Sequence, residues 1–156
     1  MVGKNVSETL TGYFNVKTAV GFVELTKQGE TFASVTDTDG NYQPVYAETG
    51  LANAVFEVRA ADDIVKLNGS TRYKKGTVIA TITTDSSGVA KSPPLYLGKY
   101  ELVEVTAPQN MVLDNTPIIV DLKQNGDTVT TAQNSYKNSR QKVKISLAKI
   151  LEQNEQ

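Results

Sequence analysis

Short runs of alternating apolar and polar residues, separated by turn dipeptides, constrain the fold of this chain more than any other feature. A period of two places successive side chains on opposite faces of a β-strand, as in "KYELVEV" at 99–105. Asp-Gly, Asn-Gly and Ser-Gly pairs favour the tight turns that join antiparallel strands. The strand-like runs are 21–27, 53–60, 76–84, 99–105, 116–123, 127–138 and 142–149, and the turn pairs are Asp39-Gly40, Asn68-Gly69, Ser87-Gly88 and Asn125-Gly126. The sequence therefore predicts an all-β fold, an antiparallel β-sandwich.

The composition excludes several kinds of chemistry. The chain has no cysteine and no histidine, so disulfides, thiol catalysis and a Ser-His-Asp set are all ruled out. A net charge of −1 with both signs interspersed argues against nucleic acid and anionic membranes as partners, and no apolar run is long enough for membrane insertion. In "DTDGN" at 37–41, Gly40 falls at the fourth position of a candidate calcium loop instead of the sixth, so a turn is favoured over a metal site. We expect no metal and no cofactor.

The two ends of the chain resemble each other. "GKNVSETLTGYFN" (3–15) aligns without a gap with "GDTVTTAQNSYKN" (126–138), and "VELTK" (23–27) aligns with "ISLAK" (145–149). This indicates a tandem array with a period of roughly 122 residues.

The array interpretation sets the expected domain boundaries. Residues 17–140 form the domain. Residues 1–16 are the last strand of a preceding repeat or an N-terminal tail, and residues 141–156 are the first strand of a following repeat or a C-terminal tail.

Three strands each place one polar residue in phase with apolar or aromatic neighbours. Glu104 shares a strand face with Tyr100 and Leu102, Lys27 follows Val23 and Leu25 with the same period, and Asn138 is in phase with Tyr136 and Asn134. A buried charge is costly unless it is paired or neutralised. From parity alone, the simplest interpretation is an internal Lys–Glu ion pair with an asparagine hydrogen-bonded nearby.

The same residues resemble a known family. "VELTK", "LANAVFEV", "LYLGKYELVEVTAP" and the final "YKN" are similar to the B-type repeat domains (CnaB or SpaA-like) of Gram-positive collagen adhesins and pilins, over about Val20 to Asn138. The most specific part is Gly98-x-Tyr100-x-Leu102-x-Glu104-x-x-Ala107-Pro108. The resemblance implies an immunoglobulin-like sandwich of the CnaB type that serves as a stalk or backbone module of an extracellular, cell-wall-anchored protein. It also implies an intramolecular isopeptide bond between Lys27 and Asn138, assisted by Glu104.

The chemistry of these residue types fits the implied roles. An apolar setting favours the neutral forms of Lys27 and Glu104. A neutral Lys27 amine can attack the side-chain carbonyl carbon of Asn138, while Glu104 polarises the amide and carries protons as ammonia leaves. The reaction consumes its own side chains, so the domain is not an enzyme with turnover.

Alternative residues for the same roles are weaker candidates. Asn134 lies on the face of Asn138, but its counterpart in the N-terminal repeat is Thr11, whereas Asn138 is matched by Asn15. Lys149 matches Lys27 and would belong to the following unit. We therefore favour Asn138 over Asn134.

The polar segment 28–50 departs from the compact family pattern and leaves a second functional hypothesis open. Phe32, Tyr42 and Tyr46 within it either anchor a loop or line a surface for host matrix or glycan. The expected partners are therefore neighbouring repeats of the same protein or, in the alternative, a host ligand.

Overall fold

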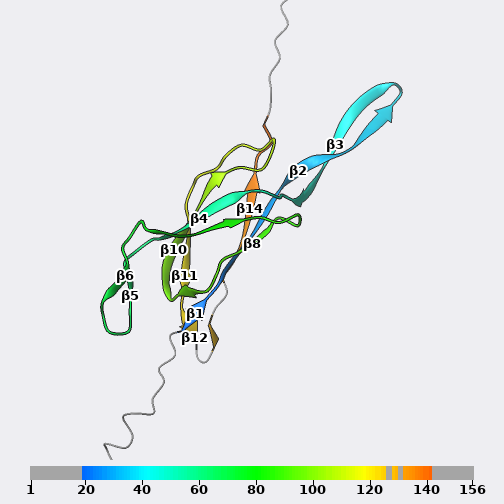
Figure 1. Cartoon of the computed structure of the whole chain (residues 1–156). Coiled ribbons are helices and arrows are strands. Elements are labelled where there is room, and N and C mark those ends of the chain that lie inside the picture. Colours follow the sequence, from blue (N-terminus) through cyan, green and yellow to red (C-terminus); the bar gives the residue numbers. More distant parts are fainter. Residues whose placement is uncertain (1–18, 126–127, 130–131, 142–156) are drawn as a thin grey trace, which may run out of the picture.

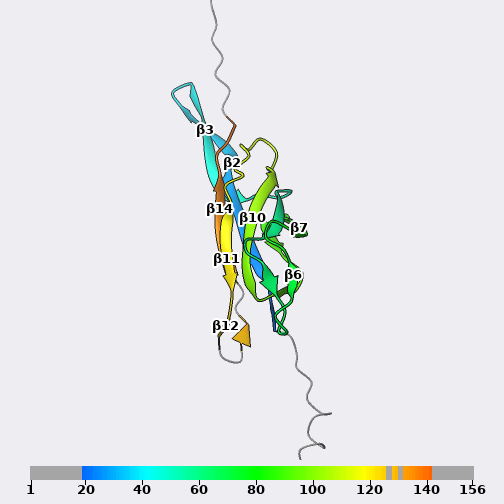
Figure 2. The ribbon, with the colours of Figure 1, turned by 90° about the vertical axis from the view of Figure 1, so that its left-hand side faces the viewer.

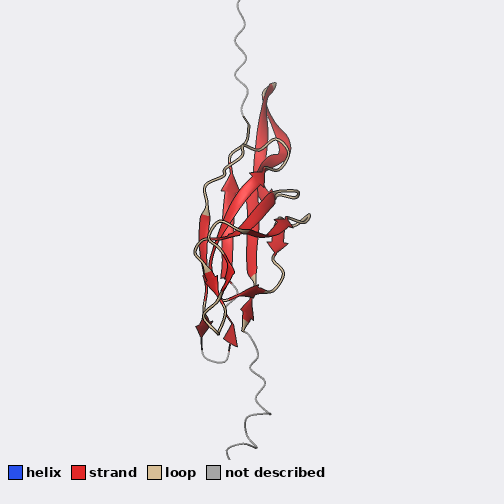
Figure 3. Cartoon of the chain, turned by 60° about the vertical axis from the view of Figure 1, so that its left-hand side comes forward, coloured by secondary structure: helices blue, strands red, loops and turns tan. Residues whose placement is uncertain are grey.

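The computed structural model describes residues 19–125, 128–129 and 132–141 of the chain. Every regular element in these residues is a β-strand (Figure 3). The strands are β1 (Val20–Gly21), β2 (Val23–Thr38), β3 (Asn41–Gly50), β4 (Val55–Ala60), β5 (Ile64–Val65), β6 (Thr71–Tyr73), β7 (Val78–Thr83), β8 (Val89–Lys91), β9 (Leu95–Tyr96), β10 (Gly98–Thr106), β11 (Ile118–Leu122), β12 (Gln124–Asn125), β13 (Thr128–Val129) and β14 (Ala132–Asn138). The described residues contain no helix able to cross a membrane.

Two sheets build the body of the domain. One has the strand order β11-β10-β4-β7, and the other has the order β14-β2-β3, with β8 also paired to β2. In Figure 2, β3 and β14 lie to the left of β10 and β7. The predicted all-β, immunoglobulin-like sandwich is confirmed.

The core follows the alternation read from the sequence. Side chains at every second position of β4, β10 and the first part of β2 (residues 23–29) point between the sheets, because successive residues of a strand face opposite sides. The main hydrophobic cluster of the core consists of Val23, Leu25, Ala54, Phe56, Val58, Ala60, Ile64, Ile82, Ala90, Leu95, Tyr100, Leu102, Val120 and Leu122.

One strand pairing is parallel. β14 runs alongside β2 in the same direction, from Ala132 opposite Val23 to Asn138 opposite Gly29, whereas the other described pairings are antiparallel. The first long strand and the last strand of the domain therefore lie side by side.

The polar segment 28–50 is a hairpin made of the second half of β2 and the whole of β3. It projects beyond the other strands (Figure 1). Asp39 and Gly40 form its turn, with φ angles of 54° and 80°, and the Asp37 carboxylate accepts the Gly40 N–H at 2.8 Å. Two consecutive positive φ angles are typical of a type I′ hairpin turn. The acidic residues of "DTDGN" thus serve the turn that the sequence favoured.

Several sequence predictions concern residues outside the described part of the chain. These are the strands expected at 3–15 and 142–149, together with Asn15 and Lys149. The domain boundaries at 1–16, 17–140 and 141–156 remain predictions.

Candidate cross-linking site

Lys27 lies at the point where the pairing partner of β2 changes from β8 to β3. Residues 24–26 of β2 pair with β8, and the pairing with β3 begins at Gln28. At the junction, the Lys27 N–H donates to the Gly88 carbonyl at 2.7 Å, and the Lys27 carbonyl accepts the Leu51 N–H at 2.9 Å. Both backbone polar groups of Lys27, the N–H and the carbonyl, are therefore hydrogen-bonded, and the Lys27 side chain is fully buried.

Gly88 allows the chain to approach Lys27 this closely. It has a φ of +81°, and a Cβ atom at this position would stand 2.3 Å from the Lys27 carbonyl oxygen and 2.7 Å from the Leu51 nitrogen. Only glycine tolerates both the positive φ and this contact.

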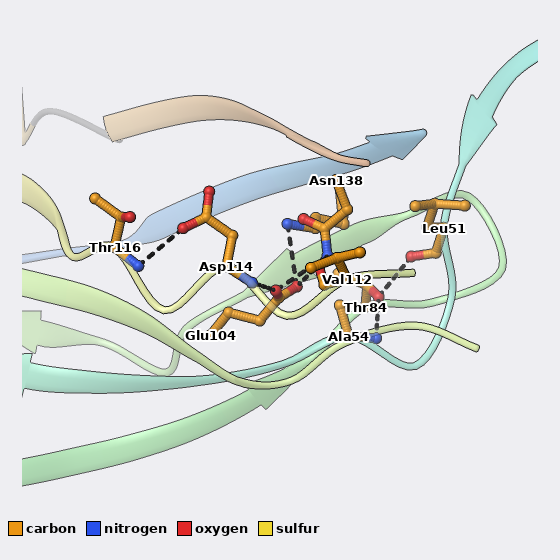
Figure 4. Close-up of polar contacts among 9 residues, drawn as sticks. Leu51, Ala54, Thr84, Glu104, Val112, Asp114, Thr116 and Asn138 are labelled. Atoms are coloured by element: carbon orange, nitrogen blue, oxygen red, sulfur yellow. Dashed lines mark hydrogen bonds and ion pairs between the residues drawn. The ribbon is translucent and has the colours of Figure 1, made fainter. Parts of the chain in front are cut away.

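Thr84 fixes the segment that leads from the junction into β4. Its hydroxyl accepts the Ala54 N–H at 2.9 Å and donates to the Leu51 carbonyl at 2.7 Å (Figure 4). Because Leu51 also holds the Lys27 carbonyl, this buried hydroxyl supports the position of Lys27 through the backbone.

Glu104 meets Lys27 from the opposite sheet. It sits in β10 across from Phe56 of β4, just before a register shift, and its side chain is only 1% exposed. Glu104 Oε1 lies 3.0 Å from Lys27 Nζ. The ammonium also lies 5.4 Å from the centroid of the Phe56 ring, which forms an apolar wall of the site.

Asn138, at the end of β14, completes the cluster. Its side-chain Nδ2 donates to Glu104 Oε1 at 3.2 Å, to Glu104 Oε2 at 3.0 Å and to the Val112 carbonyl at 3.0 Å. Its Oδ1 is buried and accepts no hydrogen bond from the described residues. The structure thus brings the three predicted side chains, Lys27, Glu104 and Asn138, into one buried group.

The loop between β10 and β11 contributes two backbone atoms that sequence analysis did not identify. The Val112 carbonyl faces the Asn138 amide, and the Asp114 N–H donates to Glu104 Oε2 at 3.0 Å (Figure 4). The side chain of Val112 is exposed. A backbone contact does not depend on residue type, so the sequence could not identify these two atoms. The Ala107-Pro108 pair of the family motif, which precedes the loop, was the available signal that this segment belongs to the site.

Burial dominates the electrostatics of the site. Loss of water around Lys27 lowers the pKa of its amine below 10.5, and the hydrogen bond and charge of Glu104 oppose this shift. Hydrogen bonds from Thr116 hold the pKa of Asp114 below 3.8, with a smaller contribution from the positive charge of Lys27. The site therefore makes the neutral amine of Lys27 easier to form than in water.

Asn134, the alternative to Asn138, lies opposite Leu25 in the β14–β2 ladder. Its side chain is outside the described part of the structure. The described residues include no group of three acidic residues placed to hold a metal ion.

A match to a family model identifies the class of protein to which this chain belongs. The family model of the SpaA prealbumin-like fold domain matches residues 41–137, which is more than half of the chain. The chain therefore belongs to this family, as the sequence resemblance predicted. Glu104 lies inside the matched range and Asn138 directly follows it, whereas Lys27 precedes its first residue, 41.

Two solved pilin structures, SpaD and GBS52, have the same fold. The major pilin SpaD of Corynebacterium diphtheriae is 20% identical with a TM-score of 0.54, over 81% of this chain and 34% of SpaD. The minor pilin GBS52 of Streptococcus agalactiae is 18% identical with a TM-score of 0.50, over 85% of this chain and 49% of GBS52. The Bacillus cereus major pilin BcpA, in its D312A form, is 23% identical with a TM-score of 0.45, over 77% of this chain and 29% of that pilin. The chain thus spans less than half the length of each, and no curated protein matches it.

Proposed function

We propose that this domain is a structural stalk module of an extracellular, cell-wall-anchored adhesin or pilin-like protein, stiffened by an isopeptide bond between Lys27 and Asn138. The observation that carries the proposal is the buried cluster in which Glu104 contacts both the Lys27 amine and the Asn138 amide. An internal ion pair needs no asparagine, whereas a cross-link needs an amine, a carboxamide and a proton carrier in contact.

The reaction balances with these three side chains alone. A proton passes from Lys27 Nζ to Glu104 Oε1, and the neutral amine attacks Asn138 Cγ to form the Nζ–Cγ bond. Glu104 then gives its proton to Nδ2, the Cγ–Nδ2 bond breaks and ammonia leaves. A second proton moves from Nζ to Glu104, which leaves an amide and a protonated carboxyl group. The fold supplies proximity, and the reaction occurs once per chain, so the domain is not an enzyme with turnover.

Intact-protein mass spectrometry tests the proposal. Loss of ammonia should make the folded protein lighter than its sequence mass by about 17 Da. Lys27→Ala, Asn138→Ala and Glu104→Gln should each restore the full mass. Lys99→Ala is a matched control, because Lys99 also pairs with an acidic residue, Asp62 at 3.6 Å, but on the exposed surface.

If well-folded wild-type protein had its unmodified sequence mass, this would contradict the cross-link. The interpretation of the site as a buried ion pair would then remain. Peptide mapping after digestion should join the peptide containing Lys27 to the one containing Asn138, and a link to Asn134 instead would reassign the acceptor.

Family membership and fold support the stalk role. Two of the solved structures with this fold are described as the major pilin SpaD and the minor pilin GBS52. Neighbouring repeats of the same protein would then be the partners of this domain.

The projecting hairpin favours a second candidate function, binding of host matrix or glycan. Phe32 and Tyr42 are 61% and 69% exposed, and Val35 lies between them, also exposed. A glycan-array and matrix-protein screen of the wild type beside a Phe32→Ser/Tyr42→Ser variant separates the candidates. Binding lost in the variant supports a ligand-binding module, and no binding supports the stalk role alone.

A further inference from the structure

The loop after β10 is tied to the end of β14 by backbone contacts. The Val112 N–H donates to the Ser139 carbonyl and the Gln141 N–H donates to the Asn110 carbonyl, both at 2.9 Å. Between them, Met111 forms an isolated bridge with Arg140, and its side chain is buried. This anchoring holds the Val112 carbonyl at a fixed distance from Asn138.

The Val112 carbonyl determines which way the Asn138 amide points. Since a carbonyl oxygen only accepts hydrogen bonds, the group that faces it at 3.0 Å has to be the NH₂. Turning the amide over would set Oδ1 against the Val112 oxygen and lose the donation to Glu104. The nitrogen that has to leave is therefore held beside the carboxylate that has to protonate it.

Asp114 performs the corresponding task for Glu104. Its N–H and Asn138 Nδ2 both donate to Oε2 at 3.0 Å, and Oε1 faces Lys27 Nζ. The two carboxylate oxygens thus have different surroundings, and Oε1 is the oxygen placed to take the lysine proton. The Asp114 side chain accepts the Thr116 N–H at 3.0 Å, which fixes the loop at this point.

We propose that residues 112–114 position the cross-linking reaction through two backbone groups: the Val112 carbonyl orients the leaving amide of Asn138, and the Asp114 N–H orients Glu104. The inference rests on the proposed function and assigns to this loop a role in the rate of bond formation. The side chains of Val112 and Leu113 take no part in this positioning.

Backbone ester substitution tests the two contacts separately. Replacing Leu113 by its α-hydroxy acid turns the Val112 carbonyl into an ester carbonyl, which is a weaker acceptor. The same change at Asp114 removes the N–H that reaches Glu104. The same change at Asn115 is the matched control, since neither the Asn115 N–H nor the Asp114 carbonyl makes a hydrogen bond within the described residues.

Each protein is made in a short cell-free translation pulse, and the loss of about 17 Da is followed by mass spectrometry. Loss of a hydrogen bond to a charged group changes an equilibrium or rate constant by roughly tenfold to a hundredfold. The ester at 114 should therefore slow formation of the cross-link by that factor. The ester at 113 should slow it several-fold, and the control ester should not. Equal rates for all three esters and wild type would overturn the inference.

Genetically encoded variants provide a second route. Asp114→Pro also lacks the N–H and should be slow, whereas Asp114→Asn retains both the N–H and an oxygen for Thr116 and should react nearly as fast as wild type. A slow Asp114→Asn with a fast Asp114→Pro would overturn the inference. To separate positioning from stability, the three esters are also melted in a Lys27→Met background, where no bond forms. If an ester slows cross-linking but does not lower the melting temperature in the Lys27→Met background below that of the control ester, the backbone group acts by positioning. A far lower melting temperature would show a purely structural role.

A readout independent of the bond distinguishes this inference from the proposed function. In Lys27→Met protein, the Asn138 side-chain NH₂ should exchange slowly with solvent by NMR, and the ester at 113 should accelerate that exchange. If wild-type protein had its unmodified sequence mass, only the cross-link would be refuted, and the positioning inference would still be open to this test. Rapid exchange of the Asn138 NH₂ in Lys27→Met protein would refute the positioning role of Val112.

Discussion

The cross-link should provide a large part of the stability of this domain. Lys27 and Asn138 are 111 positions apart (138 minus 27), so a bond between them closes nearly the whole described chain into a loop. By analogy with a disulfide across such a loop, the lost entropy of the unfolded chain corresponds to about 5 kcal/mol. For a protein of this size, that free energy corresponds to a melting temperature about 10–20 °C higher.

The reference protein for this measurement is Lys27→Met/Glu104→Gln. Glu104→Gln alone would leave the fully buried Lys27 ammonium beside a neutral amide, and an uncompensated buried charge adds a further cost of about 3–5 kcal/mol. The double variant removes the bond and the ion pair together and leaves no uncompensated charge of this pair in the core.

Scanning calorimetry of both proteins, each checked by mass, gives the result. A wild type that carries the bond yet melts within about 3 °C of the double variant would refute the entropic argument.

Three further predictions concern pH, close packing and the domain boundary. In Asn138→Ala, the free energy of unfolding should rise with pH from the lowered pKa of folded Lys27 up to 10.5, its value in the unfolded chain, because the folded state releases this proton first. Urea titrations against Lys27→Met/Asn138→Ala measure this rise, and a constant difference between the two variants would contradict it. Gly88→Ala should destabilise the domain by about 3 kcal/mol or more and slow cross-linking, since its Cβ would meet the Lys27 and Leu51 backbone. Gly69→Ala is the matched control, with a φ of +82° but no atom within 4 Å of the new Cβ, and should cost only about 1 kcal/mol in denaturant unfolding; equal losses would argue against the contact. Deleting residues 1–16 should leave the mass loss and the main melting transition unchanged, because the described core is built from residues 23–122, and a deletion variant that fails to fold would move the domain boundary.

The strand alternation made much of the core predictable from the sequence. Val23, Leu25 and Lys27 share one buried face, and Tyr100, Leu102 and Glu104 share another, as the period of two requires. A charged residue in phase with buried neighbours is informative because it contradicts local hydrophobicity. That contradiction identified Lys27 and Glu104 before any distance was known.

Other features could not be predicted because they depend on the backbone or on distant pairing. Every residue carries a carbonyl and, proline apart, an N–H, so nothing in Val112 or Asp114 distinguishes them as contacts of the site. The polar segment 28–50 has no apolar face to give a period, and only its Asp39-Gly40 turn indicated a hairpin. The parallel alignment of β14 with β2 arises from the path of the whole chain between them.

That parallel alignment determines how the domain would respond to tension. The chain enters β2 at Val23 and leaves β14 at Asn138, at opposite ends of the paired strands. Pulling on the two ends would slide the strands along each other, so the hydrogen bonds of the ladder would resist together instead of opening one after another. With Lys27 joined to Asn138, the force would pass from the start of β2 through the new amide and out of the domain. Residues 28–137 would then carry no tension, and the sandwich could extend no further without breaking a covalent bond.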